Sequence, residues 1–232
     1  MEMAHSSKSM VLEETKKLAH RIIHVPKGGF LFREQEDASE FYIVKSGLIQ
    51  ISKLTENGKE LTLRCLSAEA CCGELTLFAI DPKYLFNAKA LEDSEIYAVK
   101  IERIETMILS SNPEFVREFM IMINEHMRKQ HTKFRDLVLN GKKGALYSTL
   151  IRMANSYGVE VEGGILIDLK LKNQELANYC GTSRERVNRM LNELAQEGIL
   201  SLPSRQIIIH DLDRLKQLNH CEDCPISVCV ID

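Results

Sequence analysis

The stretch from Leu171 to Leu200 constrains the fold most, because its pattern predicts two short helices joined by a tight turn. Asn173 is a favourable N-cap for the first helix, and Gly181 ends it because glycine adopts the left-handed conformation of a helix stop. Thr182 followed by Glu185 predicts a capping box for the second helix. Both helices should pack through apolar residues on one side: Leu176, Ala177 and Cys180 in the first, and Val187, Met190, Leu191 and Leu194 in the second.

The opposite face of the second helix carries side chains that hydrogen-bond base edges and phosphates. They gather in its first turns, where recognition helices touch DNA, and are Ser183, Arg184, Glu185, Asn188 and Arg189. Two apolar runs, Ile199 to Leu202 and Gln206 to His210, flank a turn at Pro203 and Ser204 and predict a small β-wing. The alternative is an ordinary amphipathic helical hairpin with a solvated charged face. The wing favours a winged helix-turn-helix that binds double-stranded DNA.

The segment LKNQELANYCGTSRERVNRMLNELAQEGIL resembles the DNA-binding segment of the CRP/FNR family of bacterial transcription regulators. The family plan can be laid on the chain from about Ile23 to Asp213 and implies an α+β fold. It also implies a homodimer on palindromic DNA with TGTGA-like half-sites, and contact with RNA polymerase. The resulting division is an N-terminal surface helix or frayed arm at 1–20, a cyclic-nucleotide-binding-like β-barrel at 21–111, a dimerisation helix at 112–140, a winged helix-turn-helix at 141–213 and a cysteine extension at 214–232.

Short strands broken by glycines predict a β-barrel or jelly roll for the first of these domains. They are Ile22 to Val25, Phe30 to Phe32, Glu40 to Lys45, Leu48 to Leu54 and Glu60 to Leu66, with a hairpin signal at Asn57 and Gly58. The resemblance implies a phosphate-binding turn at Gly73, Glu74 and Leu75, but Phe86 stands where the family has a phosphate-neutralising arginine. A buried, unpaired phosphate would cost several kcal/mol. We therefore expect a retained turn and no cyclic nucleotide.

Apolar residues recur from Asn112 to Leu139, over about 28 residues or roughly 40 Å of helix. Such a length predicts a two-stranded parallel dimer interface, with Gln130 near the seam favouring one register. A helix that covers its own barrel would explain the first two turns only. Asn140, Gly141 and Gly144 predict a hinge before a further helix at Ala145 to Tyr157. The predicted seam comprises Phe115, Phe119, Met122, Ile123, Met127, Phe134, Leu137 and Val138, with His126 and Gln130 in phase.

Three cysteines, Cys221, Cys224 and Cys229, are bunched near the end of the chain with the spacing C-x2-C-x4-C, and Pro225 follows the second. The spacing indicates metal rather than disulfides. A [4Fe–4S] cluster commonly takes closely spaced cysteines, one beside proline, but needs a fourth ligand. Zinc also needs four ligands and would recruit His210 or His220. A thiol switch, or cysteines in a frayed tail, is the third interpretation.

The hinge segment FRDLVLNGKKGALYSTLIRM and the cysteine tail are similar to the Bacillus-type FNR branch of the family. That resemblance implies a [4Fe–4S] cluster completed by a carboxylate on the dimerisation helix, and Asp136 stands in the matching position. A hard oxygen ligand gives one labile iron, which suits attack by oxygen or nitric oxide. By resemblance we expect the cluster to report oxygen and the protein to activate genes of anaerobic life. The alternative for Asp136 is a solvated helix residue beside Arg135. The remaining cysteines predict small buried hydrophobic positions: Cys65, Cys71, Cys72 and Cys180.

Charge and composition limit the other classes of protein. The formal net charge is −3, yet 141–220 carries 11 Lys and Arg against 9 Asp and Glu, as a local DNA reader requires. No apolar run approaches the roughly 18 residues of a membrane span, and the amino terminus lacks the apolar region of a secretory signal, so we expect a cytoplasmic protein. A P-loop and a nucleophile elbow are both missing, so we expect no enzyme. An effector-binding module of a larger assembly would explain the barrel but not the winged motif.

Overall fold

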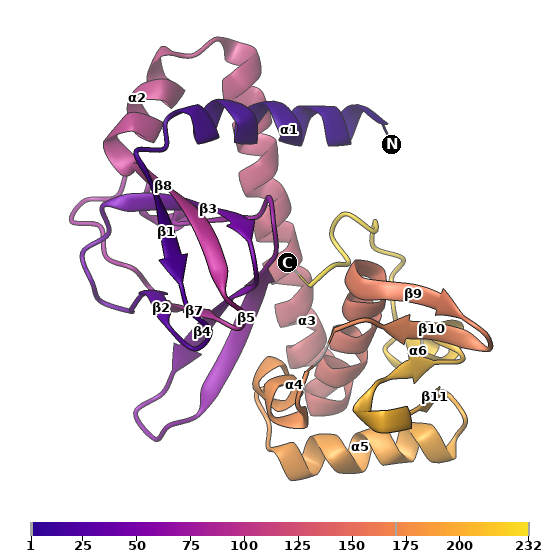
Figure 1. Cartoon of the computed structure of the whole chain (residues 1–232). Helices are drawn as coiled ribbons and strands as arrows, with labels where there is room; N and C mark the ends of the chain where they lie inside the picture. Colours follow the sequence, from indigo (N-terminus) through magenta and orange to yellow (C-terminus); the bar gives the residue numbers. More distant parts are fainter. Residues whose placement is uncertain (1, 170, 232) are drawn as a thin grey trace. The chain divides into compact units, whose positions relative to one another are not determined.

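The computed structural model describes residues 2–169 and 171–231 and divides into two compact units (Figure 1). The first unit combines the residues up to Lys53 with Leu63–Glu125, and the second combines Leu54–Thr62 with His126–Ile231. The expected α+β fold is confirmed, with an antiparallel sheet domain, a long helix and a helix-turn-helix. None of the helices in the described ranges is long and apolar enough to cross a membrane.

Two four-stranded sheets make up the β-domain. One is β1 (Arg21–Val25), β8 (Ser94–Lys100), β3 (Glu40–Ser46) and β6 (Cys71–Cys72), in that order. The other is β2 (Phe30–Phe32), β7 (Asn87–Ala90), β4 (Ile49–Leu54) and β5 (Glu60–Leu66). Alternate side chains of both sheets, such as Val44, Ile49, Ala88 and Ile96, are completely buried in one apolar cluster. The predicted strands are therefore confirmed to within a residue or so at their ends.

The hairpin predicted at Asn57 and Gly58 is present between β4 and β5. The Thr55 N–H donates to the Lys59 carbonyl at 2.9 Å, and the Gly58 N–H donates to the Thr55 carbonyl at 2.9 Å. A 3-10 turn, η1 (Glu74–Thr76), follows β6 and contains the turn that the sequence placed at Gly73 to Leu75. Both turns are therefore formed by residues that lie a few positions apart in the sequence.

Helix α1 (Glu2–Lys17) packs against the β-domain, and its second half is not the surface arm that the sequence suggested. Val11 is 1% exposed and Leu12 is 3% exposed. They join a cluster with α2 (Ile101–Ser110) and with the first turns of α3 (Pro113–Tyr157). The sparse apolar pattern of this segment hid its role, because the burying partners come from distant parts of the chain.

Helix α3 is assigned as one element, but Gly141 inside it has φ 62° and ψ −154°. That combination is accessible essentially to glycine alone, so the helix is broken there. The Asn112 side chain accepts a hydrogen bond from the Phe115 N–H at 2.8 Å and caps the start. The break predicted at Asn140 to Gly144 is therefore present and falls on Gly141, with helical residues on both sides.

The residues that the sequence assigned to the dimer seam lie on two different faces of α3. Phe115, Phe119 and Met122 are about 5% exposed and pack in the core of the first unit. Gln130 is part-buried, and its place near the seam stays a prediction. Both faces are apolar, and periodicity cannot tell which of them a neighbour covers. The large apolar residues that α3 leaves exposed are Met120 and Ile121 in the first unit, and Met127, Phe134, Val138 and Leu139 in the second.

The second unit holds the helix-turn-helix, α4 (Asn173–Tyr179) and α5 (Arg184–Gln196), coloured orange in Figure 1. The predicted wing is present as β11 (Leu200–Ser201) and β12 (Ile208–Ile209), with a 3-10 turn, η2 (Pro203–Arg205), between them. A hairpin that the sequence analysis missed, β9 (Gly158–Val161) and β10 (Gly164–Ile167), extends this sheet to the order β11-β12-β10-β9. Helix α6 (Leu212–Leu218) leads to the cysteine tail.

Two predicted helix caps are wrong by one residue. Lys172, not Asn173, is the N-cap of α4, and its backbone N–H donates to the Glu175 carboxylate at 2.6 Å. Ser183, not Thr182, caps α5, because its hydroxyl accepts from the Arg186 N–H at 3.3 Å. Two residues, Thr182 and Ser183, separate Gly181 (φ 56°) from the first residue of α5. The second of them, Ser183, is therefore the N-cap of α5.

Candidate metal centre and DNA-binding face

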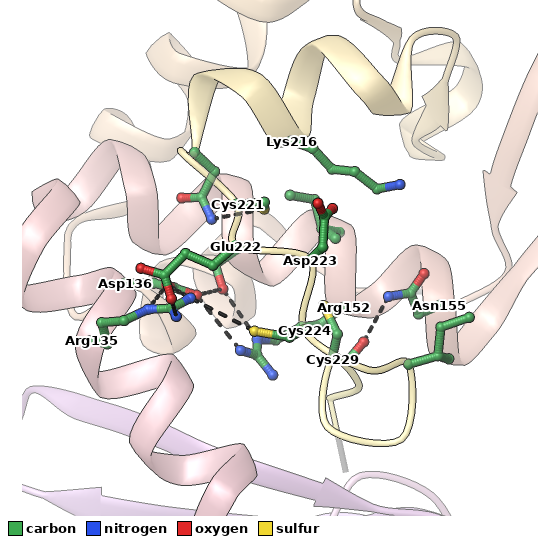
Figure 2. A pocket seen from close by; sticks show the side chains of 14 residues that line it. Arg135, Asp136, Arg152, Asn155, Lys216, Cys221, Glu222, Asp223, Cys224 and Cys229 are labelled. Carbon is green, nitrogen blue, oxygen red and sulfur yellow. Dashed lines mark hydrogen bonds and ion pairs between the residues drawn. The ribbon is translucent and has the colours of Figure 1, made fainter.

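A pocket of about 180 Å³ in the second unit is lined by Asp136 and by all three tail cysteines, Cys221, Cys224 and Cys229 (Figure 2). Asp136 comes from α3, before the Gly141 break, whereas the cysteines follow α6. Arg135, the residue before Asp136, is 89 residues from Cys224 in the sequence. The fold therefore brings the two halves of the predicted ligand set to one place.

Residues 219–231, which follow α6, contain no helix or strand but are held in a defined path. His220 (φ 51°) and Asp223 (φ 49°) take left-handed conformations, which turn the chain sharply on either side of the first cysteine. Beyond Pro225 the N–H groups of Val228 and Cys229 donate to its carbonyl at 2.9 and 3.0 Å. These turns bend the tail back toward the pocket.

Asp136 is a buried carboxylate rather than a solvated helix residue, since it is 3% exposed. Its Oδ1 accepts from Arg135 Nε at 3.1 Å and Nη2 at 2.9 Å. Its Oδ2 accepts from the Ser148 hydroxyl at 2.6 Å and lies 3.6 Å from Arg152 Nη2. The carboxylate is therefore paired with two guanidinium groups and one hydroxyl.

Arg152 fastens the tail, and the sequence analysis did not find it. It is 2% exposed, and its Nη1 donates to the carbonyls of Val228 at 2.8 Å and Val230 at 3.4 Å. Asn155 Nδ2 donates to the Cys229 carbonyl at 2.7 Å. The available signal was an arginine inside the apolar run 149–154, because a charge on the buried side of a helix requires partners.

A nitrogen donor lies near two of the three cysteine sulfurs. Arg135 Nη2 lies 4.0 Å from Cys224 Sγ, and Figure 2 shows these two side chains next to each other. Asn219 Nδ2 lies 3.6 Å from Cys221 Sγ. Burial raises the pKa of Cys229, although the positive charge of Arg152 lowers it in part.

Three cysteines and one carboxylate line the pocket, and they are donors of the kinds that iron–sulfur clusters and zinc take. Among residues 2–169 and 171–231, no three His, Cys, Asp or Glu side chains lie close enough together to hold one metal ion. Zinc requires four donors on one ion, whereas a [4Fe–4S] cluster spreads four ligands over four irons. The pocket also contains Asn219 Oδ1, a buried acceptor without a hydrogen-bond partner in the described part of the chain. Such an atom is typical of a site that receives a further group.

Helix α5 presents the predicted DNA-contacting residues in its first turns. Ser183, Arg184, Glu185 and Arg189 are exposed, while the four apolar residues of the opposite face are buried as predicted. Asn188 is part-buried, and its side-chain carbonyl accepts a hydrogen bond from the Asn173 amide of α4. The face that carries the arginines therefore stands free of the unit's core.

Two of these side chains have local partners. The pKa of Glu185 is lowered, because its carboxylate accepts from its own backbone N–H and from the Ser183 hydroxyl. Arg189 Nε lies 3.8 Å from a carboxylate oxygen of Glu193, which also pairs with Lys143 at 2.8 Å. Contacts of exposed pairs like these contribute little, so Arg189 is available for a base or a phosphate.

The turn after β6 uses its carboxylate internally. Glu74 Oε1 accepts from Arg64 Nη1 at 2.6 Å, and both side chains are less than 10% exposed. Phe86 packs against the apolar cluster of the β-domain. The predicted retained turn is present. The other four cysteines, Cys65, Cys71, Cys72 and Cys180, are buried as the sequence predicted.

Comparison with known proteins decides the family. A model described as the cyclic nucleotide-binding domain matches residues 22–111, and the Crp-like helix-turn-helix domain matches residues 144–218. The anaerobic regulatory protein of Bacillus subtilis (strain 168) is 49% identical over 207 residues, which cover 89% of this chain and 87% of that protein. The chain belongs to the CRP/FNR family. It is a transcription regulator and not an enzyme, its helix-turn-helix binds DNA, and structures of the family are dimeric.

More distant CRP/FNR proteins share the whole plan. The CRP-like cAMP-activated global transcriptional regulator of Mycobacterium tuberculosis (strain ATCC 25618 / H37Rv) is 26% identical over 208 residues, covering 89% of this chain and 91% of that protein. A CooA mutant from Carboxydothermus hydrogenoformans gives a TM-score of 0.75 at 24% identity and covers 89% of this chain and 90% of that one. FixK2 from Bradyrhizobium japonicum gives 0.72 at 22% identity and covers 85% and 96%. These structures establish the fold.

Proposed function

We propose that this CRP/FNR protein senses oxygen and activates genes of anaerobic metabolism, using a [4Fe–4S] cluster held by Cys221, Cys224, Cys229 and Asp136. The observation that carries the proposal is the single pocket lined by these four residues from distant parts of the sequence. The similarity to an anaerobic regulatory protein supports it.

Each residue has a distinct part in this assignment. The three thiolates and one carboxylate supply four ligands, and a cluster with one hard oxygen ligand among thiolates offers an iron that oxygen attacks readily. Arg135 and Asn219 direct N–H groups toward two of the sulfurs. The buried cation Arg152 offsets the negative charge that ligated thiolates bring into the pocket.

Ligands on both sides of the Gly141 break connect sensing to DNA binding. Asp136 precedes the break, and the tail follows the DNA-binding helices. Ligation therefore favours one arrangement of the segments joined at the break, and this differential affinity shifts its population. We infer that the recognition helices then match the operator spacing, and that loss of the ligands frees the hinge.

The DNA target follows from the two-fold symmetry of a dimer. We expect palindromic DNA with TGTGA-like half-sites about one helical turn apart. Arg184 or Arg189 would bind guanine through O6 and N7, and Glu185 would accept from cytosine N4. Ser183 and Asn188 complete the contact set. RNA polymerase would be contacted from the β-domain, and a cyclic nucleotide should leave DNA binding unchanged, because Glu74 is engaged by Arg64.

Anaerobic purification of the full chain followed by iron, sulfide and zinc assays tests the proposal. We expect about four irons and four sulfides per chain for a [4Fe–4S] cluster, bleaching in air, and loss of specific DNA binding with the bleaching. Alanine at Cys221, Cys224 or Cys229 should abolish iron retention, and Asp136→Ala should make it labile. Cys180→Ala is the matched control, because Cys180 is the buried C-cap residue of α4 and does not line the pocket.

Other outcomes of the same assays overturn the proposal. One zinc per chain without sulfide would establish the zinc alternative, and reversible thiol oxidation without metal would establish the thiol switch. If Asp136→Ala keeps a full, oxygen-sensitive cluster, the fourth ligand lies elsewhere and the coupling through the break fails.

A further inference from the structure

Both oxygens of the Asp136 carboxylate already have partners within the chain. Oδ1 is held by two nitrogens of Arg135, and Oδ2 is held by the Ser148 hydroxyl at 2.6 Å with Arg152 Nη2 at 3.6 Å. Both oxygens are therefore engaged inside a site that is almost completely buried. Iron binding at Oδ2 would compete with the Ser148 hydroxyl and with the positive charge of Arg152 for the position of this oxygen.

Ser148 and Arg152 lie on the helical segment beyond the break, while Asp136 lies before it. Arg152 Nε donates to Ser148 Oγ at 3.1 Å, so the hydroxyl is held by one partner and donates to the other. Arg152 Nη2 also donates to Thr132 Oγ1 at 2.9 Å, one helical turn before Asp136. The pair thus forms a preorganised cradle for a carboxylate, and this cradle contains no metal-binding group.

We propose that Ser148 and Arg152 are positioning residues that form a second resting position for the Asp136 carboxylate and compete with iron for it. This inference rests on the proposed role of Asp136 as the fourth ligand. The carboxylate exchanges between iron and the cradle, and so the cradle sets how tightly the fourth ligand holds the cluster.

The exchange leaves the end of the tail in place. Arg152 reaches the carbonyls of Val228 and Val230 through Nη1, a nitrogen that does not touch Asp136, and the Ile231 N–H donates to the Ser156 hydroxyl at 3.0 Å. Val228 and Ile231 are each 1% exposed. The chain therefore keeps its cysteines beside the pocket in both positions of the carboxylate. A lost cluster can then be rebuilt while the end of the tail stays attached.

Ser148→Ala tests the competition, because it removes the shortest contact of Oδ2 and no proposed ligand. Without metal, the melting temperature of the full chain should fall by roughly 3 to 12 °C, as expected for one lost hydrogen bond to a charged group. In the anaerobically reconstituted protein, the concentration of a ferrous chelator that removes half of the iron should rise about three- to tenfold. The two readouts move in opposite directions, which a merely structural hydroxyl would not cause.

Thr149→Val is the matched control. Thr149 is the next residue of the same helix, is 3% exposed, and donates its hydroxyl to the Ala145 carbonyl at 2.7 Å. Its loss should lower the melting temperature by a similar amount and leave the chelator midpoint within twofold of the wild type. This result would separate general destabilisation from an effect on the ligand.

The competition is overturned if Ser148→Ala loses iron at a lower chelator concentration than the wild type, because Ser148 would then support the liganded carboxylate. It is also overturned if the chelator midpoint stays within twofold of the wild type. In either case a wild-type protein that holds iron and sulfide leaves the proposed function intact. A wild-type protein without iron and sulfide overturns the proposed function together with this inference.

Discussion

Arg152→Met provides the sharpest test of how the cysteine tail is attached. The guanidinium is 2% exposed and donates to Val228 O at 2.8 Å, Thr132 Oγ1 at 2.9 Å and Ser148 Oγ at 3.1 Å. Methionine fills much of the same space without donors. The substitution therefore removes the hydrogen bonds and the charge while it limits the loss of packing.

The expected loss follows from these contacts. Each hydrogen bond to a charged donor contributes about 1.5 to 3 kcal/mol, so addition alone would give roughly 4.5 to 9 kcal/mol. The folded state also regains the desolvation cost of a buried guanidinium, and Asp136 keeps Arg135 as a counter-ion. Removing one partner of a buried ion pair costs about 3 to 5 kcal/mol, and we expect the free energy of unfolding to fall by this amount.

Urea unfolding followed by circular dichroism measures this change, on full chains treated with a ferrous chelator so that metal binding does not contribute. Hydrogen exchange of the backbone N–H groups of Val228 and Ile231 should speed up in the variant, since Arg152 holds this part of the tail. Arg214→Met, at an exposed position of α6, is the control and should change stability by less than about 0.5 kcal/mol. A loss below about 1 kcal/mol for Arg152→Met, with unchanged exchange in the tail, would refute the attachment.

Three further predictions concern other parts of the chain. Arg189→Ala should weaken binding to the cognate operator by about 1 to 3 kcal/mol and relax specificity at one base pair in a competition assay; a uniform loss across sequences would make it a phosphate contact. Gly141→Ala should lower the free energy of unfolding by about 1 to 3 kcal/mol, because φ 62° with ψ −154° strains alanine, and an unchanged urea midpoint would contradict the break. The pKa of Glu40 is lowered, since the raising effect of burial is outweighed by its hydrogen bond to Arg21 and by nearby positive charge. Its stabilising contribution is therefore complete above the unfolded value of 4.5 and is lost as the pH falls through the folded value, so Glu40→Gln should narrow the difference between urea midpoints at neutral and acidic pH.

The sequence determined the elements whose signals are local. The glycine turn and the apolar spacing of Val187, Met190, Leu191 and Leu194 specify the helix-turn-helix, because each signal depends on residues a few positions apart. The hairpin at Gly58 and the break at Gly141 follow from the same kind of local rule. Even the misplaced caps are errors of only one residue.

Only the tertiary structure decided which surfaces meet. Helix α3 is apolar on two faces, and its sequence does not state that Phe115 and Phe119 pack inside the first unit while Phe134 remains exposed. In the same way, the spacing of the cysteines predicts a metal site. The burial of Asp136 beside them depends on the path that the chain takes after α6. Periodicity encodes the side of a helix that is buried, but the partner on that side is set by packing between segments far apart in the chain. Arg152 illustrates the physical reason: a charge is stable in an apolar interior only when several distant groups converge on it, and no local pattern records their convergence.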